Sequence, residues 1–252
     1  MSNTYDAFLG GRLQLHQTGY KATSDAVFVA AAVPARTGQR ILDVGSGTGA
    51  VSLCLATRIP GVTLTGVDID SDMVACAQEN AEINHIPAQW IRGSVQNAGL
   101  LKGEQFDHIV TNPPYFSNSP LRQKYAQTAH TNVPLSTWLD FCLKRLRPRG
   151  TLTLIHRTEC IPEILDCLQG RLGRLTVFPL WPKQGEPAKR CLVQGVLGSK
   201  QPFMLSAGLV MHDSHGFTAA AERIMREGAF LPLRPQIEPD FKFSTLTTSA
   251  TK

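Results

Sequence analysis

From residue 40 onward, short runs of β-branched residues alternate with amphipathic stretches of helix length. This alternation is typical of βαβ units, in which helices connect the parallel strands of one sheet. Five runs predict those strands: 40–44, 62–68, 88–92, 106–111 and 151–156. Two further runs, 174–180 and 190–197, flank a turn-rich segment and predict an antiparallel hairpin at the sheet edge. The expected fold class is α/β, with a doubly wound, mostly parallel sheet.

The segments outside these strands suggest how the chain is organised. Ser24-Asp25 is expected to cap a helix from Ala26 to about Val33, which Pro34 ends. Further helices are expected near 160–170 and from Thr218 to about Arg226, the second after a short apolar run at 203–211. With 252 residues and 42% apolar content, one compact domain is the simplest account. The expected division is an N-terminal lid or substrate segment, a main domain and a flexible tail: 1–36, 37–231 and 232–252.

Composition limits the cellular setting and the partners. The chain lacks a basic start followed by an apolar stretch, and it has no run of ~18 uncharged apolar residues. Its six cysteines form no C-x-x-C pair, and His212 and His215 have no carboxylate cluster beside them. We therefore expect a cytoplasmic protein with reduced cysteines, no membrane span and no metal. The composition does not predict an oligomeric state.

Basic residues slightly outnumber acidic ones, which gives a formal charge of +5. That excess suits a polyanionic partner but does not establish one. Four basic residues fall within six positions: Lys144, Arg145, Arg147 and Arg149. This group is either part of a nucleic-acid surface or simply a solvated face.

A glycine-rich loop follows the first predicted strand. Gly45, Gly47 and Gly49 let a ligand approach the backbone at the carboxyl end of the strand, where a helix begins. Asp68, at the end of the next strand, is placed to accept hydrogen bonds from ribose hydroxyls. Gly45-x-Gly47-x-x-Ala50 also satisfies the dinucleotide fingerprint, so the loop alone leaves the nucleoside cofactor open.

The fourth predicted strand is followed directly by Asn112-Pro113-Pro114-Tyr115. A planar amino group is a poor nucleophile because its lone pair is delocalised. The Asn112 side-chain oxygen and the Pro113 carbonyl can accept both amino hydrogens, while the prolines hold these acceptors in place. Tyr115 can stack on a base, so the motif predicts transfer of a group to an amino nitrogen.

Two motifs carry a family resemblance. Asp43 followed by the three glycines resembles the first motif of class I methyltransferases, and Asn-Pro-Pro-Tyr resembles the catalytic motif of amino-methyltransferases. The resemblance implies the Rossmann-like class I fold, S-adenosylmethionine as cofactor and Asn112, Pro113, Pro114 and Tyr115 as catalytic residues. It implies cofactor contacts from ten positions: Asp43, Gly45, Ser46, Gly47, Gly49, Asp68, Ile69, Ser94, Val95 and Asn112. Ser94 stands where an acidic residue is usual, which should weaken one hydrogen bond to the cofactor adenine.

The segments at 9–31 and 209–228 look like the bacterial family that methylates an adenine of valine tRNA. Thr23-Ser24 departs from the usual Gly-Thr of that family. Membership would imply methylation of the adenine next to the anticodon, so the expected partner is tRNA or another structured RNA with an exposed adenine. The loop after Tyr115 could grip that strand through four side chains: Phe116, Arg122, Lys124 and Tyr125.

Other functions share these motifs. Asn-Pro-Pro-Tyr also resembles the catalytic motif of protein glutamine-N5 methyltransferases and of amino-methyltransferases that act on rRNA and DNA. The glycine loop is compatible with an NAD-dependent oxidoreductase. The glutamine-modifying family usually carries a helical domain before its cofactor core. Here only the stretch up to Gln39 precedes the first strand of the sheet.

Overall fold

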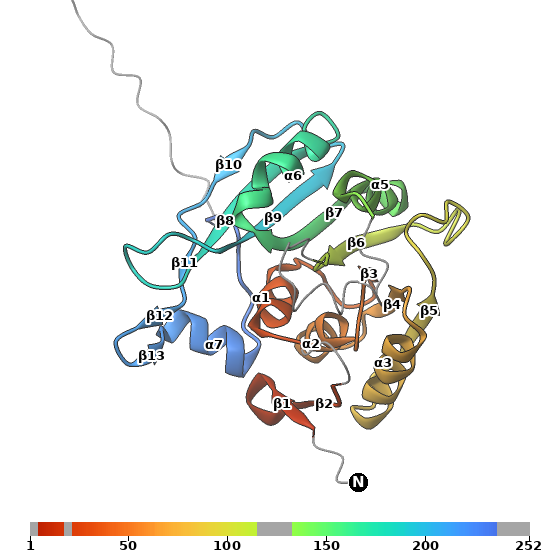
Figure 1. The fold of residues 1–252 in the computed structure, drawn as a ribbon, viewed down its shortest axis with the longest axis horizontal. Helices are drawn as coiled ribbons and strands as arrows, with labels where there is room; N and C mark the ends of the chain where they lie inside the picture. The colour runs from red at the N-terminus through yellow and green to blue at the C-terminus, as the bar shows by residue number, and fades with distance from the viewer. Residues whose placement is uncertain (1–4, 18–21, 115–132, 236–252) are drawn as a thin grey trace, which may run out of the picture.

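The computed structural model describes residues 5–17, 22–114 and 133–235 (Figure 1). The described residues form a nine-stranded sheet. Its strand order is β10-β8-β9-β7-β6-β3-β4-β5, and β11 also pairs with β8. The parallel core is β3 (Arg40–Val44), β4 (Thr63–Asp68), β5 (Ala88–Arg92), β6 (Phe106–Thr111) and β7 (Leu146–Arg157). The predicted α/β class and mostly parallel sheet are confirmed.

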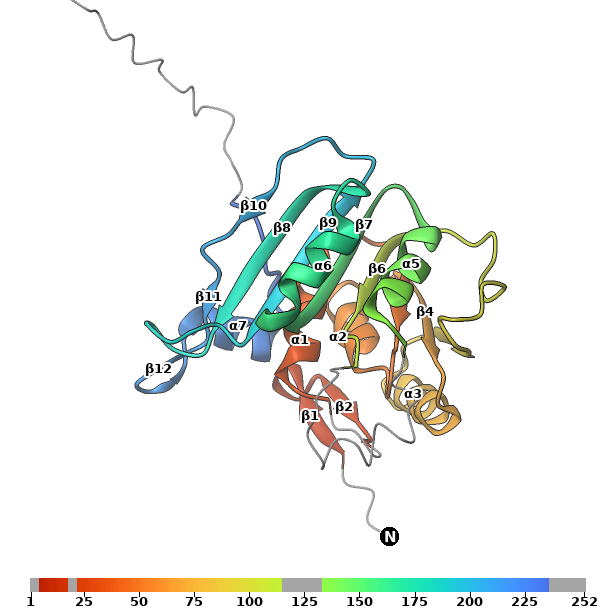
Figure 2. The same ribbon diagram turned by 45° about the horizontal axis from the view of Figure 1, so that its top comes forward.

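Alternating side chains give the sheet two apolar faces. On β3, Ile41 packs on one face while Leu42 and Val44 pack on the other. Helices α1 (Ser24–Ala32), α2 (Ala50–Arg58) and α7 (Ala219–Glu227) cover the first face. Helices α5 (Leu135–Arg145) and α6 (Ile161–Leu168) cover the second (Figure 2). Helix α3 (Ser71–Ile83) connects β4 to β5 at the end of the sheet. The result is a three-layer fold.

The N-terminal residues form a small hairpin, β1 (Asp6–Phe8) and β2 (Leu13–Leu15), joined by the 3-10 turn Leu9–Gly11. Helix α1 follows and buries seven of its nine residues. The expected cap at Ser24-Asp25 is wrong: extended Thr23 is the N-cap, and its hydroxyl accepts from the Asp25 N–H at 3.3 Å. The helix therefore begins two residues earlier than predicted.

The fifth strand also begins earlier than predicted, at Leu146. Leu146 pairs with Phe106 before the ladder shifts register, and Arg149 adopts a positive φ of 65° in the irregular stretch. A regular alternating pattern begins only after this irregularity, at Thr151. The sequence pattern could therefore show only the second part of β7.

The predicted antiparallel hairpin is present as β8 (Leu172–Trp181) and β9 (Arg190–Leu197), with β9 between β7 and β8. The apolar run at 203–211 forms β10 (Met204–Leu205) and β11 (Leu209–Val210), which pair with β8 from outside. Two short strands, β12 (His212–Asp213) and β13 (Gly216–Phe217), then precede α7. The hairpin thus lies one strand in from the sheet edge.

The basic group at 144–149 is not uniformly exposed. Arg145 is buried and donates to the carbonyls of Leu100, Ala98 and Phe141, while Arg147 forms an ion pair with Asp107 at 2.5 Å. Lys144, Arg147 and Arg149 are exposed. The group lies at the amino end of β6, because Leu146 is opposite Phe106, the first residue of that strand. Arg145 and Arg147 therefore have structural partners.

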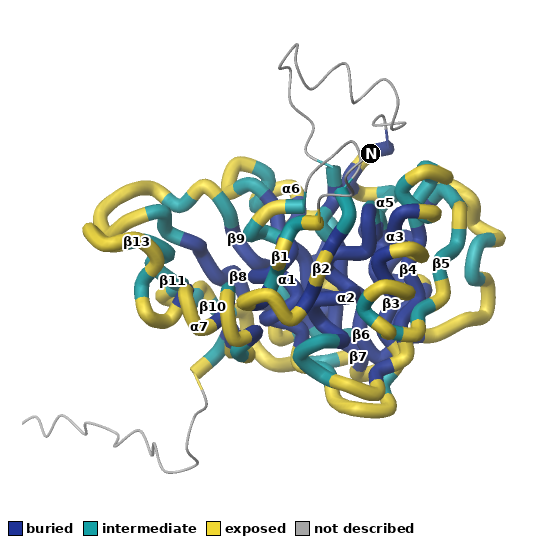
Figure 3. Tube along the Cα trace, turned by 90° about the horizontal axis from the view of Figure 1, so that it is seen from below, coloured by how far each residue is buried: buried dark blue, intermediate teal, exposed yellow. Residues whose placement is uncertain are grey.

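Buried positions concentrate in the sheet and in α1 and α2, and exposed positions concentrate in the connections (Figure 3). Within the described ranges, no helix has the length and apolar character needed to cross a membrane.

Candidate active site

Four neighbouring parallel strands, β5, β4, β3 and β6, end at the same edge of the sheet. The structure brings most of the predicted cofactor and catalytic residues to this edge. They are Asp43 on β3, the loop 45–49, Asp68 and Ile69 at the end of β4, Ser94 and Val95 after β5, and Asn112, Pro113 and Pro114 after β6. Backbone hydrogen bonds join these ends: Gly45 donates to Val67 and Gly93 donates to Asp68, both at 2.8 Å.

Asp68 holds the glycine loop. One carboxylate oxygen accepts from the Gly47 N–H at 2.8 Å, and the other accepts from the Asp70 N–H at 3.0 Å. Each oxygen has a second lone pair, so both can still accept a ribose hydroxyl. Gly47 has a φ of +52°, and a Cβ there would meet no described atom within 4 Å. The loop backbone at Gly47 is therefore open to a ligand.

Asp43 is fully buried beneath this loop. Its Oδ2 accepts from the Ser52 hydroxyl at 2.8 Å and from the Ser52 N–H at 3.2 Å. Its Oδ1 has no hydrogen-bond partner among the described residues. Burial raises the pKa of Asp43 to about 7, and nearby Asp68 adds to the rise while the Ser52 bonds oppose it. A buried carboxylate oxygen without a donor fits a cofactor that carries positive charge.

The remaining cofactor positions surround the same loop. Ser94 is partly buried, and its hydroxyl accepts from the Gln96 N–H at 3.2 Å. That oxygen can accept a second hydrogen bond, but without the charge assistance of an acid. Val95 is buried beside it and belongs to the apolar core on the second face of the sheet.

Asn112 is held through its neighbour Thr111. The Thr111 hydroxyl donates to the Val44 carbonyl at 2.7 Å and accepts from the Trp138 indole N–H at 2.9 Å. The Trp138 ring also lies against Gly45, where a Cβ would come within 2.7 Å of it. Trp138 on α5 therefore contacts the ends of β3 and β6 together, a role that no sequence pattern indicated.

A second tryptophan that the sequence did not single out lies on β5. A Cβ at Gly66 would come within 2.2 Å of the Trp90 ring, and one at Gly49 within 2.8 Å. Trp90 therefore packs across the middle of β4 and beneath the end of the glycine loop. Gly66 in a strand interior was an available signal, because such a glycine often marks close approach of another group.

The predicted substrate side lies partly outside the described residues. Tyr115, Phe116, Arg122, Lys124 and Tyr125 belong to that undescribed range. His212 stacks on Phe217 at a ring separation of 4.6 Å. In the described part of the chain, no three His, Cys, Asp or Glu side chains gather as a metal site.

Residues 23–176 match the family model of the methyltransferase small domain. The chain belongs to that family. A Vibrio campbellii relative named tRNA1(Val) (adenine(37)-N6)-methyltransferase is 29% identical over 220 residues, covering 84% of this chain and 89% of its own. A Porphyromonas gingivalis relative of the same name is 32% identical over 177 residues, covering 63% of this chain and 68% of its own.

Solved structures agree with this membership. A protein described as a predicted O-methyltransferase from Agrobacterium tumefaciens is 26% identical with a TM-score of 0.69, covering 82% of this chain and 98% of its own. A Listeria monocytogenes structure described as a putative class I S-adenosylmethionine-dependent methyltransferase has a TM-score of 0.58 at 15% identity, covering 87% of this chain and 73% of its own, and it shows the fold alone. This member of the methyltransferase small-domain family is an S-adenosylmethionine-dependent methyltransferase, which removes the ground for the oxidoreductase alternative.

Proposed function

We propose that the protein methylates the exocyclic amino nitrogen of an adenine in tRNA, the one adjacent to the anticodon of a valine tRNA. The observation that carries this proposal is the placement of Asn112-Pro113-Pro114 beside the glycine loop, at the carboxyl ends of adjacent strands. The names of the Vibrio and Porphyromonas relatives support the same substrate. Such a substrate implies work in the cytoplasm, where the six free cysteines would stay reduced.

The glycine loop and the strand ends beside it hold the cofactor in this proposal. The open backbone at Gly47 lets it approach, Asp68 binds its ribose, and Ser94 and Val95 contact its adenine. Asp43 supplies negative charge beneath the loop, and its donorless oxygen favours a cationic group nearby. When bound, S-adenosylmethionine supplies a methyl group on a positively charged sulfur. Gly45, Ser46, Gly49, Ile69 and Asn112 complete the contacts.

Asn112 and Pro113 prepare the amino nitrogen. The Asn112 side-chain oxygen and the Pro113 carbonyl accept its two hydrogens, so the nitrogen lone pair faces the methyl group. Pro113 and Pro114 fix the backbone φ, and the bonds linking Trp138, Thr111 and the Val44 carbonyl hold the preceding residue. The acceptors are thus in place before substrate arrives, which lowers the entropic part of the barrier.

Five predicted substrate contacts complete the proposal: Tyr115, Phe116, Arg122, Lys124 and Tyr125. An adenine in an anticodon loop leaves its stack more readily than one in a duplex, and Tyr115 or Phe116 could then stack on it. Arg122, Lys124 and Tyr125 would contact the neighbouring RNA backbone or bases.

Transfer of a radiolabelled methyl group to bulk tRNA tests the proposal, with Asn112→Ala as the comparison. Loss of one preorganised acceptor should lower kcat by roughly 100-fold or more. Thermal melting of both proteins controls for folding. Equal labelling by wild type and variant would refute the role of Asn112.

Nucleoside mass spectrometry identifies the methylated atom and the molecule. N6-methyladenosine in the valine tRNA is the expected product. Release factor, rRNA and DNA serve as competing substrates in the same assay. Preferential labelling of any of these would replace tRNA as the substrate while leaving the amino-nitrogen chemistry intact.

A further inference from the structure

Helix α3 and its C-cap residue bind the end of the N-terminal strand β2 through two asparagine side chains one turn apart. Asn84 accepts from the Gln14 N–H at 3.0 Å and donates to the Gln14 carbonyl at 2.7 Å. Asn80 accepts from the His16 N–H at 2.7 Å and donates to the His16 carbonyl at 2.9 Å. The spacings agree, because four helical residues rise ~6 Å and two strand residues span roughly 6.6 Å. The two side-chain amides therefore pair with the backbone of residues 14 and 16 in the way that a neighbouring β-strand would.

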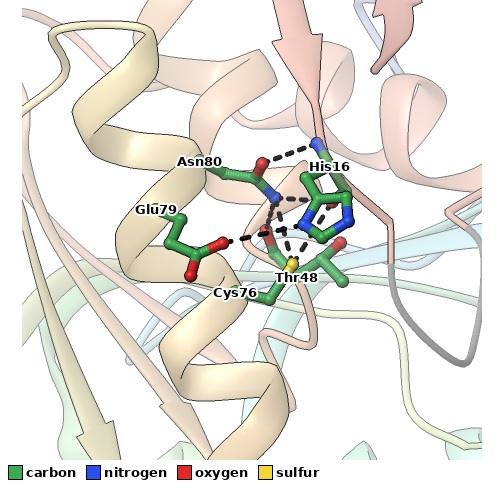
Figure 4. Close-up of polar contacts among 5 residues, drawn as sticks. All are labelled: His16, Thr48, Cys76, Glu79 and Asn80. Atoms are coloured by element: carbon green, nitrogen blue, oxygen red, sulfur yellow. Dashed lines mark hydrogen bonds and ion pairs between the residues drawn. The ribbon is translucent and has the colours of Figure 1, made fainter. Parts of the chain in front are cut away.

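Asn80 makes two bonds that have no counterpart at Asn84, and one of them is to the Cys76 sulfur at 3.7 Å. The Asn80 side-chain nitrogen also donates to the Thr48 carbonyl at 2.9 Å, within the glycine loop. Asn80 is fully buried, and the Cys76 thiol donates to the same His16 carbonyl at 3.3 Å (Figure 4). The His16 ring lies 3.6 Å from Glu79 at the exposed side of this cluster. One amide group therefore joins the N-terminal strand to the cofactor loop.

The position of Thr48 explains why this bond matters. Thr48 lies between Gly47, whose N–H is held by Asp68, and Gly49, the left-handed N-cap of α2. Glycines give this loop large conformational freedom, which binding of a ligand would have to remove. Asp68 accepts from the N–H of Gly47, and Asn80 donates to the carbonyl of the next residue, Thr48. The loop is thereby ordered before a ligand arrives.

We propose that Asn80 is a positioning residue that sets the shape of the cofactor loop and links it to the N-terminal strand at His16. This inference rests on the proposed cofactor contacts of the loop. Asn80 acts through Thr48 and the loop backbone, without touching the reacting atoms. Its loss should raise the dissociation constant for S-adenosylmethionine and leave the chemical step almost unchanged.

Asn80→Ala and Asn84→Ala form a matched pair, because each removes an amide that pairs with β2. Calorimetry with S-adenosylmethionine should give a Kd about tenfold higher for Asn80→Ala, as expected for one lost buried hydrogen bond. Asn84→Ala should stay within about twofold of wild type by the same reasoning. At saturating cofactor, kcat of Asn80→Ala should also stay within about twofold. Thermal melting of both variants measures the loss of stability that each suffers when its amide no longer pairs with the backbone of β2.

Hydrogen exchange gives an independent readout of the link. In wild type, binding of S-adenosylmethionine should slow hydrogen exchange of the backbone amides in residues 13–16. This protection should persist in Asn84→Ala. It should disappear in Asn80→Ala, which lacks the bond to Thr48. If Asn80→Ala does not fold, Asn80→Asp replaces it, because aspartate keeps the acceptor for the His16 N–H but, when ionised, cannot donate to the carbonyls of His16 and Thr48. The expected results for Asp are the same.

The possible outcomes distinguish a failure of the proposed cofactor contacts from a failure of the proposed role of Asn80. A wild-type protein that binds no S-adenosylmethionine would overturn the proposed cofactor contacts. A wild-type protein that binds it, together with an unchanged Kd in the Asn80 variants, would overturn only the role of Asn80. Equal weakening in the Asn80 and Asn84 variants would also overturn that role, because β2 alone would then account for the effect.

Discussion

Asp43 is the residue whose environment departs most from its ordinary chemistry. Burial raises its pKa to about 7 although Ser52 donates two hydrogen bonds to it. In the free protein the acid is therefore protonated over part of the neutral range. A cationic ligand nearby would favour the ionised form. Proton release and ligand binding are consequently linked at this position.

The affinity for S-adenosylmethionine should rise as the pH increases through about 7, because the ionised carboxylate is the form that attracts the cofactor. Calorimetry between pH 6 and pH 8 in buffers of different ionisation enthalpy measures both the Kd and the proton released. Asp43→Asn should bind more weakly and show no such step. A Kd that is independent of pH in wild type would contradict the link.

The same shift predicts the pH dependence of stability. The folded-state pKa of Asp43 lies above its ordinary value, so the native protein binds this proton more tightly than the unfolded chain. The resulting stability is fully present below about pH 4 and is lost as the pH rises through about 7. Asp43→Asn should therefore raise the melting temperature of the cofactor-free protein at pH 8 more than at pH 5. An equal or opposite change at the two pH values would argue against burial as the cause.

Among the elements, β4 and β5 depend on a close fit between Gly66 and Trp90. A Cβ at Gly66 would lie 2.2 Å from the Trp90 ring, so Gly66→Ala forces the ring or the strands to move. We expect a loss of about 1–3 kcal/mol in the free energy of unfolding. Chemical denaturation measures it. Adding Trp90→Leu should recover part of the loss, whereas additive losses would show that the ring is not the obstacle.

Helix α5 reaches the site through Trp138. Trp138→Phe keeps the aromatic bulk but removes the N–H that binds Thr111, so β6 should be less firmly held just before Asn112. We expect kcat to fall about tenfold, with a stability loss of about 1 kcal/mol. Trp181→Phe provides the control, because its N–H donates to the Ala207 carbonyl at 2.9 Å at the far side of the sheet. An equal fall in kcat for both variants would contradict a specific effect of Trp138.

At the scale of the whole molecule, the exposed charges Lys144 and Arg149 lie near the amino end of β6, whereas Asn112 follows its carboxyl end. A six-residue strand spans roughly 17–20 Å, about twice the screening length at physiological salt. Replacing both residues by alanine should change the Kd for tRNA by less than about twofold. A filter-binding assay across salt concentrations tests this, and a marked loss of affinity would place RNA on that edge.

The features that could be predicted from the sequence are those that local residue patterns determine, such as the positions of the buried strands. Residues 40–44 and 106–111 were assigned correctly because buried parallel strands produce short apolar runs with turn signals at their ends. The gathering of Asp43, Asp68 and Asn112 also followed, because parallel strands end at one edge. Such patterns cannot show which distant side chain contacts a given backbone group. Trp138, Trp90 and Asn80 therefore became visible only in the folded chain.

The asparagine pairing of β2 also constrains the order in which the chain folds. Gln14 and Asn84 are 70 residues apart in the sequence, and His16 and Asn80 are 64 apart. During synthesis from the N-terminus, the strand leaves the ribosome well before its partner helix exists. At roughly 5–20 residues per second, β2 waits several seconds for α3. The backbone groups of Gln14 and His16 can therefore form these two pairs only after residues 80–84 have been synthesised.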